Sequence, residues 1–476
     1  MYAATTSVCL LGGDVRPVEV QVHVGRQAEQ FKLSGLPDTA VREAKDRVRA
    51  AVTSSGVRFP NRAVTVNLAP AHLPKSGSDF DLAIALGVLA ASGEIPNPGP
   101  VVVVGELALD GSVRSAPSSV AAAVVAARTK THCLVGAAAA PLAAMVPGSK
   151  VHGVETLSEA VSLIRSGLAS ATACLPGSRS EADYDDDLDE VLGQPMARRA
   201  LEVAAAGDHH LLLHGPPGGG KTMLARRLGG IQPPLTEEQA VEVALIHAAA
   251  GYERGLSRRR PFRAPHHTAS RAALVGGGSG VAVPGEVSLA HRGTLFLDEM
   301  AEFPRANLDT LRQPLEDGHV TVARRGITAS FPASFHLVAA TNPCPCGYLN
   351  DRRRPCLCRP AEVTRYRQRL SGPLLDRFDL VVKVDRLEAG VLETKTETSQ
   401  SVRQRVAEAR AVLDTTSPEV TPVSQGLLAA ALGDGLLTAR GVARVKRVAG
   451  TVAALSGETR VDELHVAEAM ALRGEW

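Results

Sequence analysis

The sequence is poor in aromatic residues, which make up only 3% of its 476 residues. Its cores must therefore be built from alanine, valine and leucine, which belong to a hydrophobic share of 45%. No uncharged apolar stretch reaches about 18 residues, so no segment is predicted to cross a membrane. Residues 1–15 lack the basic stretch and the cleavage-site pattern of a signal peptide. We therefore expect a cytoplasmic protein.

Net charge is also nearly absent, since 52 lysines and arginines against 50 acidic residues leave +2. This balance does not indicate a polyanionic partner. A nucleic-acid surface would have to come from the arginine clusters at 258–260, 324–325 and 352–354, although such clusters are also common on solvated faces. The seven cysteines are odd in number, and four of them fall within residues 344–358. They predict a reducing compartment rather than a disulfide framework.

The apolar pattern predicts an α/β fold and divides the chain into regions. Residues 1–170 mix β-branched runs with alanine-rich helical stretches, and residues 171–187 form an acidic linker. In residues 188–385, short apolar strands alternate with amphipathic helices, which is typical of a mostly parallel sheet. Residues 386–476 have helical spacing without a strand signal, so we expect a small helical domain.

A phosphate-binding loop is predicted after the strand-like run HLLLHG. The residues GPPGGGKT match the pattern G-x-x-x-x-G-K-[ST], and a helix-like segment follows them. The glycines let backbone N–H groups close around a phosphate, Lys221 neutralises the β- and γ-phosphates, and the Thr222 hydroxyl ligates Mg²⁺. The predicted ATP-binding residues of this loop are Gly215, Pro216, Pro217, Gly218, Gly219, Gly220, Lys221 and Thr222.

Residues beyond the loop complete the predicted ATP site. After the apolar run TLFL, Asp298 is expected to bind Mg²⁺ and Glu299 to polarise the attacking water. Asn342 ends the next apolar strand and suits a contact with the γ-phosphate or the water. Arg377 is expected to reach the nucleotide of a neighbouring subunit, with a surface ion pair as the alternative. Arg440 is a candidate ATP sensor in the helical region, or else part of a solvated helix face.

The order of these motifs resembles that of AAA+ ATPases, in which the phosphate-binding loop, LFLDE, ATN, LLDRFD and a helical lid follow one another. Longer blocks, such as RRRPFRAPHHTAS, PGEVSLAHRGTLFLDEMAEF and YRQRLSGPLLDRFDL, resemble the magnesium-chelatase-like AAA+ family of YifB/ComM type. The blocks LRQPLEDGHVTVARR and VAATNPCPCGY resemble it too, so the resemblance covers nearly the whole chain.

The resemblance implies an ATPase that uses ATP and Mg²⁺, assembles as a homo-hexamer and acts on DNA. It implies branch migration on single-stranded or branched DNA in recombination and natural transformation, with recombinase or other DNA-processing partners. A magnesium-chelatase-type motor that remodels a protein is the alternative. By the same resemblance, GHVTVARRGITASF would be a β-hairpin whose turn presents Arg324 and Arg325 to DNA phosphates, unless the tip is only solvated.

Residues 1–170 resemble the Lon-type protease domain without its serine–lysine dyad. When PKSGSDFD is laid on the family's serine segment, Asp79 takes the position of the nucleophile, and Ser76 and Ser78 are out of register. The helix that should carry the lysine has none before Lys130. A serine without an adjacent base is a weak nucleophile. We therefore predict a degenerate Lon-like domain kept for assembly or DNA contact, with an active protease as the less favoured alternative.

The sequence contains two pairs of adjacent histidines, and one pair invites a metal interpretation that the sequence does not favour. His266 and His267 would point apart on a strand, and they lack a nearby third ligand. His209 and His210 precede the strand of the phosphate-binding loop and are expected to cap or pack it.

Cys344, Cys346, Cys356 and Cys358 form two C-x-C pairs that are separated by nine residues. Four thiolates suit tetrahedral Zn²⁺, although the usual zinc-site spacing is wider than C-x-C. Reduced surface thiols and a redox switch are the alternatives. The stretch that holds these cysteines begins at Asn342 and ends before the segment that carries Arg377. We therefore predict a structural zinc clip that fixes this loop near a subunit interface.

Overall fold

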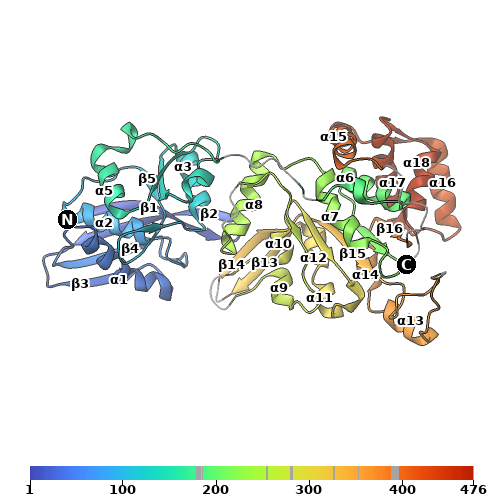
Figure 1. Ribbon diagram of the computed structural model, residues 1–476, viewed down its shortest axis with the longest axis horizontal. Helices are drawn as coiled ribbons and strands as arrows, with labels where there is room; N and C mark the ends of the chain where they lie inside the picture. The colour runs from blue at the N-terminus through green and yellow to red at the C-terminus, as the bar shows by residue number, and fades with distance from the viewer. Residues whose placement is uncertain are drawn as a thin grey trace.

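The computed structural model describes residues 1–177, 184, 186–252, 256–278, 282–324, 327–351, 353–386 and 396–474. Figure 1 shows three parts along the long axis of the molecule, with the blue N-terminal part at one end and the red C-terminal helices at the other. The fold is α/β, as predicted, with a parallel sheet in the central part. None of the helices in the described ranges combines the length and the apolar character that a membrane crossing needs.

The N-terminal part is a seven-stranded mixed sheet with helices on both faces. Its strands are β1 (Tyr2–Leu11), β2 (Asp14–Val24), β3 (Gln30–Ser34), β4 (Ala63–Ala69), β5 (Val101–Val103), β8 (His132–Gly136) and β9 (Lys150–Val154). They are ordered β3-β4-β2-β1-β5-β8-β9, and only β2 runs antiparallel to its neighbours. Helices α1 (Thr39–Ser54), α2 (Asp81–Ser92) and α5 (Leu157–Ser166) share one core cluster, and α3 (Ser119–Thr129) and α4 (Ala140–Ala143) share another.

The central part is a five-stranded parallel sheet. Its strands are β10 (Leu211–His214), β11 (Phe262–Arg263), β12 (Thr294–Leu297), β15 (His336–Thr341) and β16 (Leu380–Lys383). They are ordered β11-β12-β15-β10-β16, and the three inner strands are almost wholly buried. Continuous apolar runs of this kind suit strands that are covered on both faces. Their carboxyl ends meet at one edge of the sheet, where Asp298 follows β12 and Asn342 follows β15.

A β-hairpin leaves the central part just before β15, which confirms the predicted hairpin. Its strands β13 (His319–Arg324) and β14 (Ile327–Pro332) pair antiparallel, with Arg324 opposite Ile327. Arg324 is therefore the last residue of β13 before the tip. Arg325, the second residue predicted to contact DNA, lies outside the described residues.

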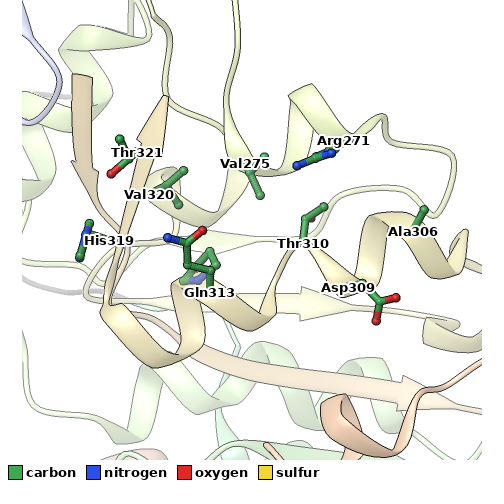
Figure 2. A pocket seen from close by; sticks show the side chains of 10 residues that line it. Arg271, Val275, Ala306, Asp309, Thr310, Gln313, His319, Val320 and Thr321 are labelled. Atoms are coloured by element: carbon green, nitrogen blue, oxygen red, sulfur yellow. The ribbon is translucent and has the colours of Figure 1, made fainter. Parts of the chain in front are cut away.

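A cavity of about 390 Å³ lies beside the base of this hairpin (Figure 2). Its walls come from β13 and from helices α9 (Arg271–Val275), α11 (Arg305–Asp309) and α12 (Arg312–Asp317). In Figure 2 the side chain of Gln313 lies between that of His319 on the hairpin and that of Thr310. The described lining includes none of the predicted ATP-binding residues, so this cavity is distinct from the nucleotide site.

The N-terminal and central parts share a hydrophobic core. Helix α8 (Glu237–Ala249) of the central part packs against α3, and Ala244 lies in the same buried cluster as Val125. The turn after β1 also touches the hairpin, because the Gly13 N–H donates to the Ser330 carbonyl at 2.9 Å. The N-terminal part is therefore packed onto the central part and onto its hairpin.

The C-terminal part consists mainly of helices α15 (Ser399–Thr415), α16 (Pro422–Gly433), α17 (Ala439–Leu455) and α18 (Glu463–Ala471). Helices α15 and α17 pack against α6 (Pro195–Gly207) of the central part. This part is helical, as predicted, and it also contains one pair of parallel strands, β17 (Glu419–Val420) and β18 (Arg460–Val461). Strands of two residues are too short to leave a periodic signal in the sequence.

Candidate active site for ATP

The phosphate-binding loop (residues 215–222) joins β10 to helix α7 (Lys221–Ile231). Its backbone turns through positive φ angles of 77° at Gly218 and 87° at Gly220. A side chain at Gly215 would clash with the Val384 carbonyl. Glycine is the residue that takes such conformations without strain. The loop therefore closes at the N-terminus of α7, where backbone N–H groups and the helix dipole favour an anion.

Lys221 is held inside this loop by oxygen acceptors. Its Nζ donates to the carbonyls of Gly215 at 2.7 Å and Pro216 at 3.0 Å, and to Asn342 Oδ1 at 3.2 Å. Burial lowers the pKa of Lys221 to about 8, and nearby carboxylates oppose this shift. A bound phosphate would supply the negative charge that favours the protonated amine.

Asp298 and Glu299 follow β12 at the same edge of the sheet. The Thr222 hydroxyl donates to Asp298 Oδ2 at 2.8 Å, so two oxygens of the kind that Mg²⁺ prefers lie together beside the loop. Glu299 is exposed and has a positive φ of 49°, and its N–H donates to Asp298 Oδ1 at 2.9 Å. The site therefore offers two ligands for Mg²⁺, Thr222 and Asp298. The Glu299 carboxylate is not one of them, so it is available to act on water.

His267 is a neighbour of Glu299 that the sequence did not reveal. Its Nδ1 lies 3.8 Å from Glu299 Oε2, and its ring packs edge-on against Phe303 with centroids 6.4 Å apart. The expectation that His266 and His267 point apart on a strand is wrong, because they lie in a turn after β11 with ring centroids 4.0 Å apart. Neither belongs to a metal-ligand group among the described residues. The loop after β11 thus brings an imidazole to the candidate water-activating carboxylate.

Asn342 follows β15, next to the loop and to the four cysteines. Cys344, Cys346, Cys356 and Cys358 have Sγ atoms within 4.8 Å of one another. The Sγ–Sγ distances among the first three are 3.4, 3.7 and 3.6 Å, and the Cys346 N–H donates to the Cys358 Sγ at 3.4 Å. These distances are far from a disulfide bond of about 2.05 Å and close to the edge of about 3.8 Å in a tetrahedron with 2.3 Å zinc–sulfur bonds. The cluster could therefore hold a metal ion.

Known proteins resemble the chain over most of its length. Residues 187–392 match the family model described as magnesium chelatase, subunit ChlI, and residues 18–139 and 396–473 match further models of subunit ChlI and its C-terminal region. The chain is 41% identical to the protein YifB of Escherichia coli, covering 84% of this chain and 80% of that protein. It is 39% identical to the competence protein ComM of Haemophilus influenzae, covering 96% and 94%. The chain belongs to the YifB/ComM family of magnesium-chelatase-like proteins.

Two further relatives match this YifB/ComM-family chain, one over nearly its whole length and one over about a third of it. The uncharacterized protein Rv2897c of Mycobacterium tuberculosis is 44% identical over 98% of this chain and 97% of that protein. A part of the chain is 32% identical to Lon protease 2 of Bacillus subtilis, covering 33% of this chain and 32% of that enzyme. The family and the sheet together make the central part an AAA+ ATPase core, and the coarse function is that of an AAA+ motor.

Arg377 lies at the opposite edge of the central sheet from the phosphate-binding loop. Leu380 at the start of β16 is level with Leu211 at the start of β10, and Arg377 precedes Leu380. At about 3.3 Å per residue, β16 alone separates Leu380 by about 13 Å from the level of the loop that follows β10, and Arg377 precedes Leu380. It forms an ion pair with Glu316, which was the alternative expected for this residue. Arg377 cannot therefore touch the nucleotide site of its own chain.

Arg440 occupies the first turn of α17 and is exposed. One turn later, Arg444 Nη1 donates to the Phe378 carbonyl at 3.1 Å. Phe378 is the residue after Arg377, so this helix begins near the same edge of the sheet as Arg377. In this YifB/ComM-family chain, the helix that begins with the predicted sensor Arg440 therefore contacts the residue next to Arg377, the arginine predicted to act on a neighbouring subunit.

The Lon-like domain has a carboxylate, Asp79, where a nucleophile would lie. Ser118, at the start of α3, donates a hydrogen bond to Asp79, and Ser78 donates one to Glu106. Burial raises the pKa of Asp79 to about 6. The buried Lys75 donates to the Pro70 carbonyl. Asp79 therefore accepts a hydrogen bond from the N-terminus of α3. In these contacts, neither Ser78 nor Ser118 has a basic side chain as its partner.

Replacing Asp79 with asparagine is expected to stabilise the protein at neutral pH. The folded-state pKa of Asp79 is raised above its ordinary value, so its ionised form is disfavoured in the fold. Ionised Asp79 therefore lowers the free energy of unfolding. This loss is absent below about pH 4 and complete above about pH 6, where it amounts to roughly 1–2 kcal/mol after allowing for partial exposure. Thermal unfolding of Asp79→Asn against wild type at pH 7.5 and pH 4 measures it. The exposed Asp110→Asn is the control, and a gain that persists at pH 4 would contradict this assignment.

Proposed function

We propose that the protein is an ATP-driven DNA motor that works as a homo-hexamer and moves branch points in recombination. The observation that carries this proposal is the separation of the ATP site into two halves. Lys221, Thr222, Asp298 and Glu299 lie at one edge of the sheet, and Arg377 lies at the other. An arginine that completes such a site from a neighbouring subunit is a feature of ATPases that hydrolyse ATP within an assembly.

Each half has a distinct task in the proposed reaction. Lys221 binds the β- and γ-phosphates, and Thr222 with Asp298 would hold a Mg²⁺ ion, which would neutralise charge that develops on the phosphates. Glu299 orients and polarises the attacking water, and His267, 3.8 Å away, steadies its carboxylate. Asn342 connects the γ-phosphate position to Lys221. Arg377 of the next subunit would stabilise the charge that grows on the transferred phosphoryl group.

DNA is the proposed track for this motor. Arg324 is the last residue of β13 and Arg325 follows it in the sequence, and two adjacent arginines suit contacts with phosphates rather than with bases. The relative ComM is named a competence protein, and a part of the chain is 25% identical to the probable DNA helicase MCM9 of Arabidopsis thaliana over 37% of this chain. A motor that remodels a protein partner, as in magnesium chelatase, is the second candidate because the family models bear that name.

Stimulation of ATP hydrolysis by DNA separates these two candidates. We expect single-stranded or branched DNA to raise the ATPase rate of the wild type severalfold and to leave the double variant Arg324→Ala/Arg325→Ala at its basal rate. The physical reason is that removing two cations from the tip removes up to two phosphate contacts. The exposed Arg128→Ala on α3 is the matched control and should keep its response to DNA. An ATPase rate indifferent to DNA in the wild type would favour the protein-remodelling candidate.

We also propose that the four cysteines hold one structural Zn²⁺. Support comes from the near-tetrahedral spacing of their Sγ atoms and from four thiolates being a ligand set that zinc prefers. Metal analysis of protein purified without chelator should find close to one zinc per chain. Less than about half an equivalent would leave the cysteines as reduced thiols in a loop.

A further inference from the structure

The cysteine loop (residues 344–358) packs directly on the phosphate-binding loop. Gly347, buried and in a positive φ conformation of 83°, leaves no room for a side chain. A Cβ atom there would lie 2.7 Å from Pro217 Cδ, 2.8 Å from Pro217 Cγ and 3.7 Å from Asn342 Cγ. The backbone of the cysteine loop is therefore seated between the phosphate-binding loop and the asparagine that binds Lys221.

A second connection between the cysteine loop and Pro217 runs through Arg386. Asp351 pairs with Arg386 at 3.6 Å, and Arg386 Nε donates to the Pro217 carbonyl at 3.4 Å. The Arg386 guanidinium also lies 5.4 Å from the centroid of the Tyr348 ring, a cation–π distance. Pro217 is thus contacted directly by Gly347, and also by Arg386, which Tyr348 and Asp351 of the segment between the two C-x-C pairs hold in place.

The positions of the ligands explain how a metal would act on this contact. Gly347 directly follows Cys346, and residues 347–355 are the segment that a metal on the cysteines closes at both ends. A cross-link that closes a loop reduces its freedom in the unbound state and fixes the segment between its ends. Without the metal, no bond would link the two C-x-C pairs, and the segment between them would lose its anchor.

We infer that metal binding at the four cysteines controls ATP binding, because the metal-closed loop braces Pro217 and Asn342 in the arrangement that receives the phosphates. The metal acts here as a positioning element and takes no part in hydrolysis. This inference rests on the proposed ATPase function. Zinc and nucleotide are then coupled ligands, so each must raise the affinity of the other by the same factor.

The first test compares nucleotide affinity in metal-free and zinc-loaded protein. Wild type is stripped with a chelator under reducing conditions, and the Kd of a fluorescent non-hydrolysable ATP analogue is measured before and after one equivalent of Zn²⁺ is returned. We expect the metal-free protein to bind roughly 5- to 50-fold more weakly, within the usual range for coupled sites, and zinc to restore the affinity. Equal Kd values overturn the inference. If the zinc-loaded protein binds no nucleotide, the proposed function fails instead.

A variant that leaves all four cysteines in place tests the contact itself. Gly347→Ala should keep its zinc and weaken nucleotide binding, because the added methyl group collides with Pro217. The matched control is Gly148→Ala, since Gly148 has a similar φ of 74° but open space around it. Equal nucleotide affinity for Gly347→Ala and wild type would show that the contact between Gly347 and Pro217 does not support nucleotide binding. This test holds even if cysteine variants fail to fold.

The reciprocal effect provides a readout that involves no hydrolysis. Competition with a chromophoric chelator should show a higher zinc affinity when saturating nucleotide and Mg²⁺ are present. Lys221→Ala, which should not bind nucleotide, must show no such gain in zinc affinity. Measuring it under identical solution conditions corrects for zinc that the free nucleotide binds. A gain of the same size in Lys221→Ala would show that the effect does not pass through the ATP site.

Discussion

Replacing Glu299 with glutamine is expected to lower kcat for ATP hydrolysis by roughly 100- to 1,000-fold while ATP still binds. The carboxylate follows β12, is exposed at the edge where the phosphates would lie, and is free of the Thr222–Asp298 pair. Glutamine has the same shape but cannot accept a proton from water at neutral pH. A steady-state phosphate-release assay, together with the Kd of the ATP analogue, separates the chemical step from binding.

Lys221→Ala supplies the contrasting pattern. Its ammonium group contacts the loop carbonyls and Asn342, so its loss should weaken ATP binding itself rather than the chemical step alone. The role of Glu299 is refuted if Glu299→Gln turns over ATP at the wild-type rate, or if it loses ATP binding as Lys221→Ala does.

Replacing Arg377 with alanine is expected to lower kcat by roughly 1,000-fold, the effect of removing an arginine that stabilises phosphoryl transfer from a second subunit. The residue lies at the wrong edge of the sheet to act on its own nucleotide. A mixture of Arg377→Ala with Lys221→Ala should therefore recover part of the activity that neither has alone. In the mixed ring, an intact phosphate-binding loop of one chain meets an intact arginine of the other.

The ion pair between Arg377 and Glu316 provides the control for this result. If Arg377 served only as a surface partner of Glu316, then Glu316→Gln would be as inactive as Arg377→Ala, and mixing would recover nothing. Under the proposed role, Glu316→Gln retains most of its activity. Analytical ultracentrifugation of each variant with nucleotide must show the same assembly as wild type, so that a lost ring is not mistaken for a lost arginine.

Local motifs made much of the ATP site predictable. The glycine pattern of the phosphate-binding loop encodes its own backbone geometry, and short apolar runs between helices predict a parallel sheet whose carboxyl ends meet. Asp298 and Asn342 follow such runs, so their placement near Lys221 and Thr222 follows from the strand order. The hairpin was predictable from β-rich arms around a glycine-containing turn together with the family resemblance.

Contacts that depend on tertiary packing left no local signal. His267 reaches Glu299 because the loop after β11 turns back toward β12, whereas its sequence context suggested an extended strand with diverging side chains. The contact of Gly347 with Pro217 joins loops that are far apart in the sequence. Likewise, the remoteness of Arg377 from its own loop follows from the register of β16 against β10. Sequence patterns do not fix such long-range pairings.

The measurement that tests the central claim most directly is branch migration of a synthetic DNA junction with labelled strands. We expect wild type with ATP and Mg²⁺ to displace the labelled strand, and Glu299→Gln to bind the same junction without displacing it. Strand release that wild type and Glu299→Gln produce equally would contradict this expectation. So would a wild type that hydrolyses ATP in the presence of the junction and leaves every strand in place.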